Sequence, residues 1–186
     1  EAGKNLVGAF YQPRLVISDI SLLSSLSQRQ LRAGLAEVIK YALIKDPELL
    51  EFLEKEHRAI LSCKPSALEY IVQRSSAIKA NIVALDERDE MGIRAVLNFG
   101  HTIGHAIETA SGYLHYNHGE AIALGILVAL DISHTMGFID KHLLHRASHL
   151  IHSVGLPTRI EKVSPRDIIE AHYHDKKFIG PKNKFV

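Results

Sequence analysis

The chain has 186 residues, of which 46% are hydrophobic and 23% are charged, enough for a domain with a sizeable core. Its 22 lysines and arginines nearly balance 21 acidic residues, so charge gives no argument for a nucleic-acid or membrane partner, although a local basic cluster can still bind a small anion. The single cysteine excludes an intrachain disulfide and favours the cytoplasm. The longest apolar run, residues 121–130, is too short to cross a bilayer, and no signal peptide is recognisable.

The first residues are expected to be the end of another domain. Glycines and a proline mark residues 1–13 as a loop, and the β-branched run RLVISD at 14–19 predicts one short strand. A lone strand needs partners, and the next candidate is the terminal KNKFV, so we expect most of the sheet to lie outside this sequence. The chain also opens on Glu1 and not on methionine, which predicts that it is part of a longer protein.

From Ser21 onward the pattern is helical. No repeat or low-complexity tract interrupts it, so the sequence predicts a mainly α fold with residues 21–186 as one domain. In chain order the expected helices are 28–44 behind a Ser27 cap, one that starts at Asp46 and Pro47, one from Pro65 toward Leu85, one after the turn 86–92 through Ala110, 118–136, 140–154, and one begun by Ser164 and Pro165.

The segment NFGHTIGHAIE carries a glycine directly before each of its two histidines. Arg94, Asn98, His101 and His105 are spaced four, three and four apart, which predicts that they share one face of a single helix whose other face is apolar. The glycines weaken a helix but let a ligand or another backbone come close. The alternative is that these four polar side chains face solvent or form hydrogen bonds within the core, without binding a ligand. Without the glutamate of HExxH, a zincin protease is disfavoured.

Two other segments carry charged or metal-binding side chains beside apolar helix residues. Glu37 and Lys40 lie three apart, either as a local ion pair or as a metal-ligand carboxylate beside an amine. His118 and Glu120 stand at the start of an apolar helix, where a capping role is the alternative, and His115 competes with His118 as a ligand. One carboxylate and two imidazoles from different helices make the ligand set of a catalytic zinc, with positions left for substrate.

A second histidine row repeats the three-to-four spacing on the helix expected at 140–154. It has no carboxylate partner, and the opposite face of the helix is apolar, so we predict a solvated row. Its members are His142, His145, His149 and His152.

Four motifs together resemble the 3-dehydroquinate synthase family. They are GLAEVIKYALIKD, LNFGHTIGHAIE, HGEAIALGI, and the closing DKK with KNKFV. The resemblance implies that residues 1–20 end an NAD-binding α/β domain and that 21–186 form the helical metal- and substrate-binding domain of a two-domain fold. It implies a lyase of the shikimate pathway that converts 3-deoxy-D-arabino-heptulosonate 7-phosphate to 3-dehydroquinate and phosphate, for aromatic amino acid biosynthesis. NAD, Zn²⁺ with Co²⁺ as a substitute, and a cytoplasmic homodimer are implied as well.

The resemblance also assigns roles to individual residues. It implies that the zinc ligands are Glu37, His101 and His118. It implies that the catalytic side chains are Lys40, His105 and Glu90. It implies substrate contacts from Lys79, Arg94, Asn98, Lys176, Lys184 and Asn5, and a cofactor contact from Lys4.

The chain departs from the family pattern in two places. Gln30 stands where the family often has an acidic residue near the nucleotide, and the turn DERDEMGIR is one residue longer, which makes Asp89 an alternative to Glu90. No Gly-rich nucleotide loop follows a strand, so we predict weak NAD binding and little activity for these 186 residues alone. The alternatives are 2-deoxy-scyllo-inosose synthase, a metal-dependent polyol dehydrogenase, and a helical interaction module with an incidental zinc.

Overall fold

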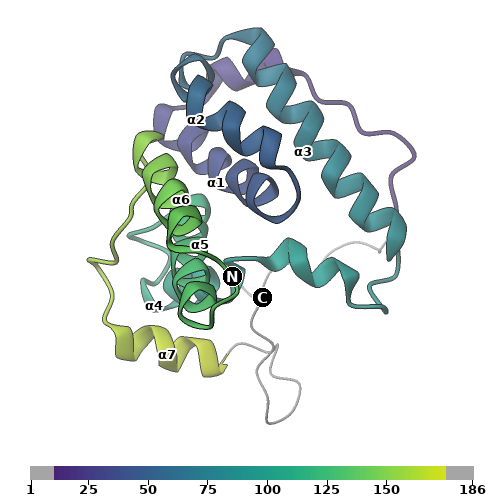
Figure 1. Ribbon diagram of the computed structural model, residues 1–186. Helices are drawn as coiled ribbons and strands as arrows, with labels where there is room; N and C mark the ends of the chain where they lie inside the picture. Colours follow the sequence, from purple (N-terminus) through teal and green to yellow (C-terminus); the bar gives the residue numbers. More distant parts are fainter. Residues whose placement is uncertain (1–10, 175–186) are drawn as a thin grey trace.

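The computed structural model describes residues 11–174, and in them the chain is helical (Figure 1). The mainly α fold is therefore confirmed, and no β-strand occurs within the described range. In chain order the elements are η1 Ile20–Ser25, α1 Gln28–Lys45, α2 Pro47–Leu61, α3 Pro65–Leu85, η2 Ile93–Asn98, α4 His101–Ala110, α5 His118–Thr135, α6 Lys141–Ser153 and α7 Pro165–His174.

Helix α1 lies at the centre of the fold, in contact with α2, α3, α5 and α6 (Figure 1). Helix α4 packs between α5 and α7 and covers a smaller apolar cluster that includes Ile107, Leu124 and Ile168. Residues 121–126 of α5 are all buried, which explains the long apolar run as a core helix surrounded by its neighbours. None of the described helices combines the length and the apolar character that a bilayer span requires.

The expected starts of α1, α2 and α5 are confirmed, and each has a local cause. Ser27 and Gln30 form a reciprocal capping box at α1, in which the Gln30 side chain accepts a hydrogen bond from the Ser27 backbone N–H at 3.0 Å. Asp46 caps α2 ahead of Pro47 in its first turn, and Asn117 caps α5 in a second capping box. Gln30 thus has a structural role at the position where the family pattern differs.

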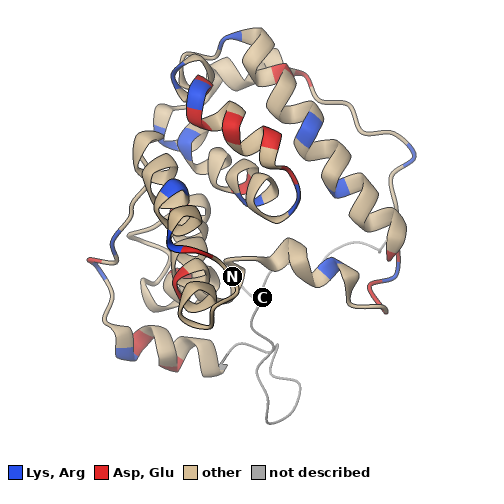
Figure 2. Cartoon of the chain, viewed as in Figure 1, with Lys and Arg blue, Asp and Glu red and all other residues tan. Residues whose placement is uncertain are grey.

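Basic and acidic side chains are interspersed over the helices, in keeping with a net charge of +1 (Figure 2). Two ion pairs connect α2 to neighbouring helices. Glu54 binds Arg146 of α6 through contacts of 2.9 and 2.8 Å. At the start of the same helix, Asp46 binds Arg74 of α3 at 2.7 and 2.6 Å. Both pairs use the two guanidinium N–H groups that suit a carboxylate, so they fix α3 and α6 against α2.

The strand expected at 14–19 is not formed. These residues have no ladder partner within the described range, and Leu15 and Ile17 are 76% and 83% exposed. A strand needs a neighbour to satisfy its backbone groups, and the sequence pattern reports only the local preference for extended structure. The prediction of a strand here is therefore wrong for this chain by itself.

The single helix expected to carry Arg94, Asn98, His101 and His105 is also wrong. A 3₁₀ helix, η2, ends at Asn98, and α4 begins at His101 after Gly100, whose φ of +78° lies in the left-handed region. The chain turns at this glycine, so the spacing across it does not give one face. The two histidines lie on α4, and the arginine and asparagine lie on η2.

The glycines of this segment do admit another backbone, as the sequence indicated. A Cβ on Gly100 would lie 2.8 Å from the backbone nitrogen of Ile126 in α5. A Cβ on Gly104 would lie 3.2 Å from the carbonyl oxygen of Ala121. The close approach of α4 to α5 therefore requires the absence of side chains at both positions.

Candidate active site

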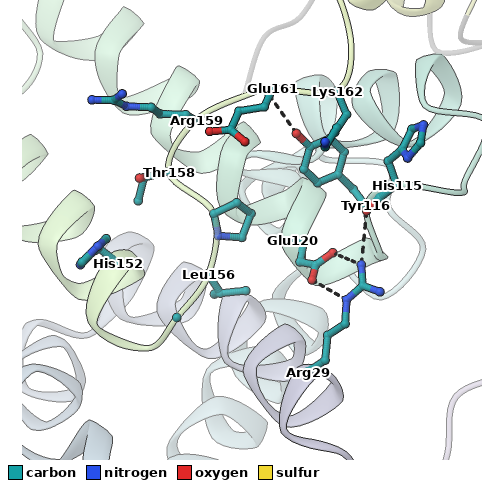
Figure 3. A pocket seen from close by; sticks show the side chains of 12 residues that line it. Arg29, His115, Tyr116, Glu120, His152, Leu156, Thr158, Arg159, Glu161 and Lys162 are labelled. Atoms are coloured by element: carbon teal, nitrogen blue, oxygen red, sulfur yellow. Dashed lines mark hydrogen bonds and ion pairs between the residues drawn. The ribbon is translucent and has the colours of Figure 1, made fainter.

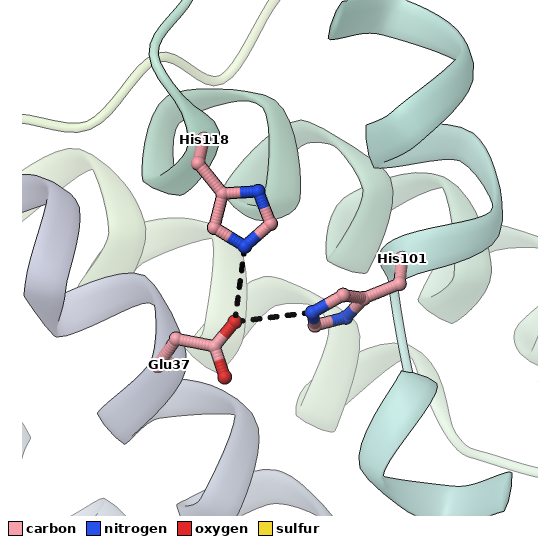
Figure 4. Close-up of side chains that lie close together, drawn as sticks. All are labelled: Glu37, His101 and His118. Atoms are coloured by element: carbon pink, nitrogen blue, oxygen red, sulfur yellow. Dashed lines mark ion pairs between the residues drawn. The ribbon is translucent and has the colours of Figure 1, made fainter. Parts of the chain in front are cut away.

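Glu37 from α1, His101 from α4 and His118 from α5 converge on one point (Figure 4). The Nε2 atoms of His101 and His118 lie 3.2 and 3.7 Å from Oε1 of Glu37. The ligand atoms of all three side chains lie within 4.8 Å of one another. Three separate helices thus bring together the carboxylate and the two imidazoles that were expected as metal ligands.

The contacts of Glu37 fit a metal ligand. Oε2 of Glu37 forms an ion pair with Lys40 Nζ. Oε1 is buried and has no hydrogen-bond partner among the described residues. Burial raises the pKa of Glu37, but its contacts with the two imidazoles and with Lys40 outweigh burial and hold the pKa below its ordinary value. An ionised carboxylate oxygen that faces two imidazole nitrogens is suited to Zn²⁺ or a similar ion.

Lys40 connects the metal-ligand cluster to η2. It is 3% exposed, and its Nζ donates to the backbone carbonyl of Leu97 at 2.7 Å as well as to Glu37 at 2.6 Å. A buried ammonium requires such partners. The ion pair uses one carboxylate oxygen and leaves the other toward the histidines, so it does not exclude the alternative of a metal ligand.

The HGE motif explains how the start of α5 reaches α1. A Cβ on Gly119 would overlap the carbonyl oxygen of Ala33, at 2.0 Å, so only glycine permits this contact. Glu120 forms a two-point ion pair with Arg29 of α1, at 2.7 Å for each contact. The glycine and the ion pair together place His118, the first residue of α5, beside Glu37.

A second group of metal-binding side chains shares His118 with the first. His105, Glu108 and His118 also have ligand atoms within 4.8 Å of one another, and Glu108 Oε2 lies 3.2 Å from Nδ1 of His118. Glu108, together with Glu37, raises the pKa of His118 to about 9. Sequence reasoning missed Glu108, although its position seven residues after His101 on the helical face gave the signal.

The loop before η2 is organised by Asp86, which sequence reasoning also missed. Its buried carboxylate accepts backbone hydrogen bonds from Glu90, Met91 and Ile93 at 2.9, 3.2 and 3.0 Å. Burial raises the pKa of Asp86, but the backbone hydrogen bonds prevail and lower it. Arg94, which follows Ile93, donates a hydrogen bond to the carbonyl oxygen of Glu87 at 3.2 Å. The Nε atom of Arg94 is buried and has no hydrogen-bond partner among the described residues.

The remaining expected site residues are less closely tied to the cluster. Asn98, Lys79 and both candidate acids, Asp89 and Glu90, are exposed. His105 lies beside the cluster, with its ring centroid 5.3 Å from that of His101 and 5.9 Å from that of His118. Four further expected residues lie outside the described range, namely Lys4, Asn5, Lys176 and Lys184.

The competing histidines lie elsewhere. All four members of the row on α6 are exposed, as expected of a solvated face. His115 lines a surface pocket of about 520 Å³ together with Arg29, Tyr116 and Glu120 (Figure 3). Glu37, His101 and His118 do not line this pocket, so the geometry favours His118 over His115.

Comparison with known proteins agrees with this geometry. Residues 34–178 match the family model of the 3-dehydroquinate synthase C-terminal region, and residues 1–33 match that of its N-terminal region. The 3-dehydroquinate synthase of Desulforamulus reducens is 47% identical over 185 residues, 99% of this chain and 51% of that protein. The 3-dehydroquinate synthase of Nitrosomonas europaea is 47% identical over 175 residues, which are 94% of this chain and 47% of that protein. The chain thus spans about half the length of these relatives.

Solved structures of sugar-phosphate cyclases share the fold. A 2-deoxy-scyllo-inosose synthase complexed with carbaglucose-6-phosphate, NAD⁺ and Co²⁺ matches with a TM-score of 0.83 and 33% identity, over 98% of this chain and 49% of that one. The 2-epi-5-epi-valiolone synthase of Streptomyces hygroscopicus, with NAD⁺ and Zn²⁺ bound, matches with a TM-score of 0.80 and 25% identity, over 91% and 47%. With most of its length matching the family model and a carboxylate and two histidines brought together, the chain belongs to the 3-dehydroquinate synthase family.

Proposed function

We propose that the chain is the metal- and substrate-binding part of a 3-dehydroquinate synthase, which converts 3-deoxy-D-arabino-heptulosonate 7-phosphate to 3-dehydroquinate and phosphate. The observation that carries the proposal is the convergence of Glu37, His101 and His118 from three helices. The identity of 47% to 3-dehydroquinate synthases supports the choice of substrate. We assign the full reaction, the cytoplasmic location and the homodimer to the whole protein.

Glu37, His101 and His118 are proposed to hold Zn²⁺, with Co²⁺ as a substitute. A bound ion of this kind acts as a Lewis acid on substrate hydroxyls and orients them. Lys40 Nζ has three N–H donors and uses two on Glu37 and the Leu97 carbonyl. We assign the third donor to a substrate hydroxyl next to the ion.

The anionic groups of the substrate need cationic partners. Arg94, Asn98 and Lys79 are proposed to bind its carboxylate, and the buried, unpartnered Nε of Arg94 supports this role because guanidinium groups bind carboxylates through two N–H donors. His105 is proposed to lie near the phosphate. Glu90, with Asp89 as the alternative, is proposed as the active-site acid. Lys176, Lys184, Asn5 and Lys4 keep their predicted roles.

NAD is proposed to bind chiefly to the part of the relatives that this chain does not span. The described residues contain no strand followed by a Gly-rich loop and a helix, the usual dinucleotide site. In addition, the Gln30 side chain is engaged in the α1 capping box. We therefore expect weak NAD binding by this chain alone.

A second candidate is 2-deoxy-scyllo-inosose synthase, which the structural match at a TM-score of 0.83 supports. The buried Nε of Arg94, which has no partner among the described residues, favours a substrate that carries a carboxylate. Comparing the binding of a carboxylate-bearing phosphonate analogue with that of carbaglucose-6-phosphate separates the two. Tighter binding of carbaglucose-6-phosphate would support the second candidate.

The metal site is tested by zinc analysis of the purified chain and of two variants, His118→Ala and His115→Ala. We expect about one zinc per chain in the unsubstituted protein and in His115→Ala, and loss of zinc from His118→Ala, because that change removes one of three ligands. The phosphonate analogue is expected to make the chain bind zinc more tightly, because two ligands that bind the same folded state each favour that state. Equal zinc in all three proteins would contradict the assignment.

A further inference from the structure

Glu108 is a buried carboxylate to which the proposed reaction gives no role. Glu108 lies on α4 and is 4% exposed. Its side chain is directed toward His118, the first residue of α5. A carboxylate is rarely shielded to this degree without a partner that stabilises its charge. One of its contacts is with Nδ1 of His118, at 3.2 Å.

The two ring nitrogens of His118 face different carboxylates. Nε2 is directed toward Oε1 of Glu37, at 3.7 Å, and Nδ1 toward Oε2 of Glu108, at 3.2 Å. A neutral imidazole carries a proton on one nitrogen and a lone pair on the other. An acceptor at Nδ1 keeps the proton there and leaves the lone pair of Nε2 for a metal ion.

His101 shows the same arrangement. Its Nδ1 lies 3.2 Å from the carbonyl oxygen of Phe99, and its Nε2 lies 3.2 Å from Oε1 of Glu37. Both histidines therefore have an oxygen acceptor behind the ring and direct Nε2 toward Glu37. The acceptor is a neutral carbonyl in one case and a charged carboxylate in the other, so the stronger hydrogen bond belongs to His118.

We propose that Glu108 is a positioning residue of the metal centre: its carboxylate fixes the tautomer and the ring orientation of His118 so that Nε2 is presented to the ion. This inference rests on the proposed zinc site. Oxygen acceptors behind metal-bound imidazoles orient the ring and increase its basicity, and their removal typically costs about 10- to 100-fold in metal affinity.

A different arrangement is a second ion held by Glu108, His105 and Nδ1 of His118, since these ligand atoms also lie within 4.8 Å. The exposure of the two carboxylates favours the positioning role. The Glu37 side chain is 33% exposed and can meet substrate, whereas that of Glu108 is 5% exposed. The ion that meets substrate therefore belongs on the Glu37 side of the ring.

The test compares zinc affinity in the unsubstituted chain, in Glu108→Gln and in the control Glu69→Gln, which changes an exposed glutamate on α3. Zinc is measured by competition with a chromophoric chelator, and Co²⁺ binding by its visible absorption bands. We expect Glu108→Gln to bind one zinc about 10- to 100-fold more weakly, with shifted Co²⁺ bands and unchanged far-ultraviolet circular dichroism. The control is expected to match the unsubstituted chain. Affinity within twofold and unshifted bands in Glu108→Gln would overturn the proposal.

Two further results keep the outcome decisive if the variant does not fold. Nitrogen NMR of the unsubstituted zinc-bound chain is expected to show metal on Nε2 and a proton on Nδ1 of His118; metal on Nδ1 would overturn the proposal. Two zinc ions per chain, falling to one in Glu108→Gln, would make Glu108 a ligand and would also overturn it. If the unsubstituted chain binds no zinc, the proposed metal site itself is wrong, which is a separate failure.

Discussion

At the scale of single residues, buried charges determine the local geometry of this chain. Lys40, Asp46, Asp86 and Glu108 are at most 7% exposed, and each has a partner from another element or from a loop backbone. A buried charge without a partner would cost several kcal/mol. Each of these residues therefore fixes the position of the group it contacts, and two of the four, Lys40 and Glu108, contact candidate metal ligands.

Asp46 gives a pH-dependent contribution to stability. Its hydrogen bond with Arg74 lowers its pKa from the ordinary value of 3.8, although burial opposes the shift. The ionised carboxylate therefore stabilises the fold above pH 4 or so, and the contribution is lost as the pH falls through the lowered pKa. We expect Asp46→Asn, which keeps a helix cap, to lower the free energy of unfolding by about 1–3 kcal/mol at pH 7.

Urea unfolding at pH 7 and at pH 3 measures this effect. The difference between Asp46→Asn and the unsubstituted chain should shrink at pH 3, because this pH lies below the ordinary pKa of 3.8, at which the unfolded carboxyl group takes up a proton. Glu51→Gln, at an exposed position of α2, serves as the control and should change little at either pH. An equal difference at both pH values would contradict the role of the ion pair with Arg74.

At the scale of elements, the close approach of α1, α4 and α5 depends on missing side chains. A Cβ on Gly125 would lie 1.9 Å from the carbonyl oxygen of Gly100, and one on Gly119 would lie 2.0 Å from that of Ala33. Core packing at normal density leaves no room to absorb such overlaps. Because each of the three helices carries one candidate metal ligand, their separation sets the distances between the ligands.

Gly119→Ala is expected to push the start of α5 away from α1. The overlap should destabilise the fold by about 1–3 kcal/mol or more and weaken zinc binding, since His118 is the preceding residue. Gly34→Ala is the matched control on α1: a Cβ there meets nothing within 4 Å, so we expect equal or slightly higher stability and unchanged zinc binding. Thermal unfolding and chelator competition measure both properties. Normal zinc affinity in Gly119→Ala would contradict the importance of this contact.

At the scale of the whole molecule, the chain presents an apolar segment to solvent at one end. Leu15, Ile17 and Leu22 are 76%, 83% and 66% exposed, ahead of the first long helix. Contiguous exposed apolar residues indicate an interaction surface.

We expect these 186 residues alone to release little or no phosphate from 3-deoxy-D-arabino-heptulosonate 7-phosphate, because the described residues contain no strand followed by a Gly-rich loop and a helix, the usual dinucleotide site. Adding the N-terminal half of a 3-dehydroquinate synthase should restore NAD-dependent phosphate release, measured together with 3-dehydroquinate. His118→Ala, tested in the same mixture, should remain inactive. Sustained turnover by the chain without an added half would contradict this prediction.

The sequence by itself determined most of the helices and the caps at Ser27 and Asp46, because apolar periodicity and capping residues are local properties. The candidate ligand set came from the resemblance of its motifs to a known family. Only the tertiary structure decided the break at Gly100, which depends on packing against α5, and the unpaired state of residues 14–19, which depends on a missing partner strand. It also decided that Glu108 lies behind His118 and that Asp86 organises the loop before Arg94. Those contacts join residues through folded turns and helix ends, where linear spacing does not report distance.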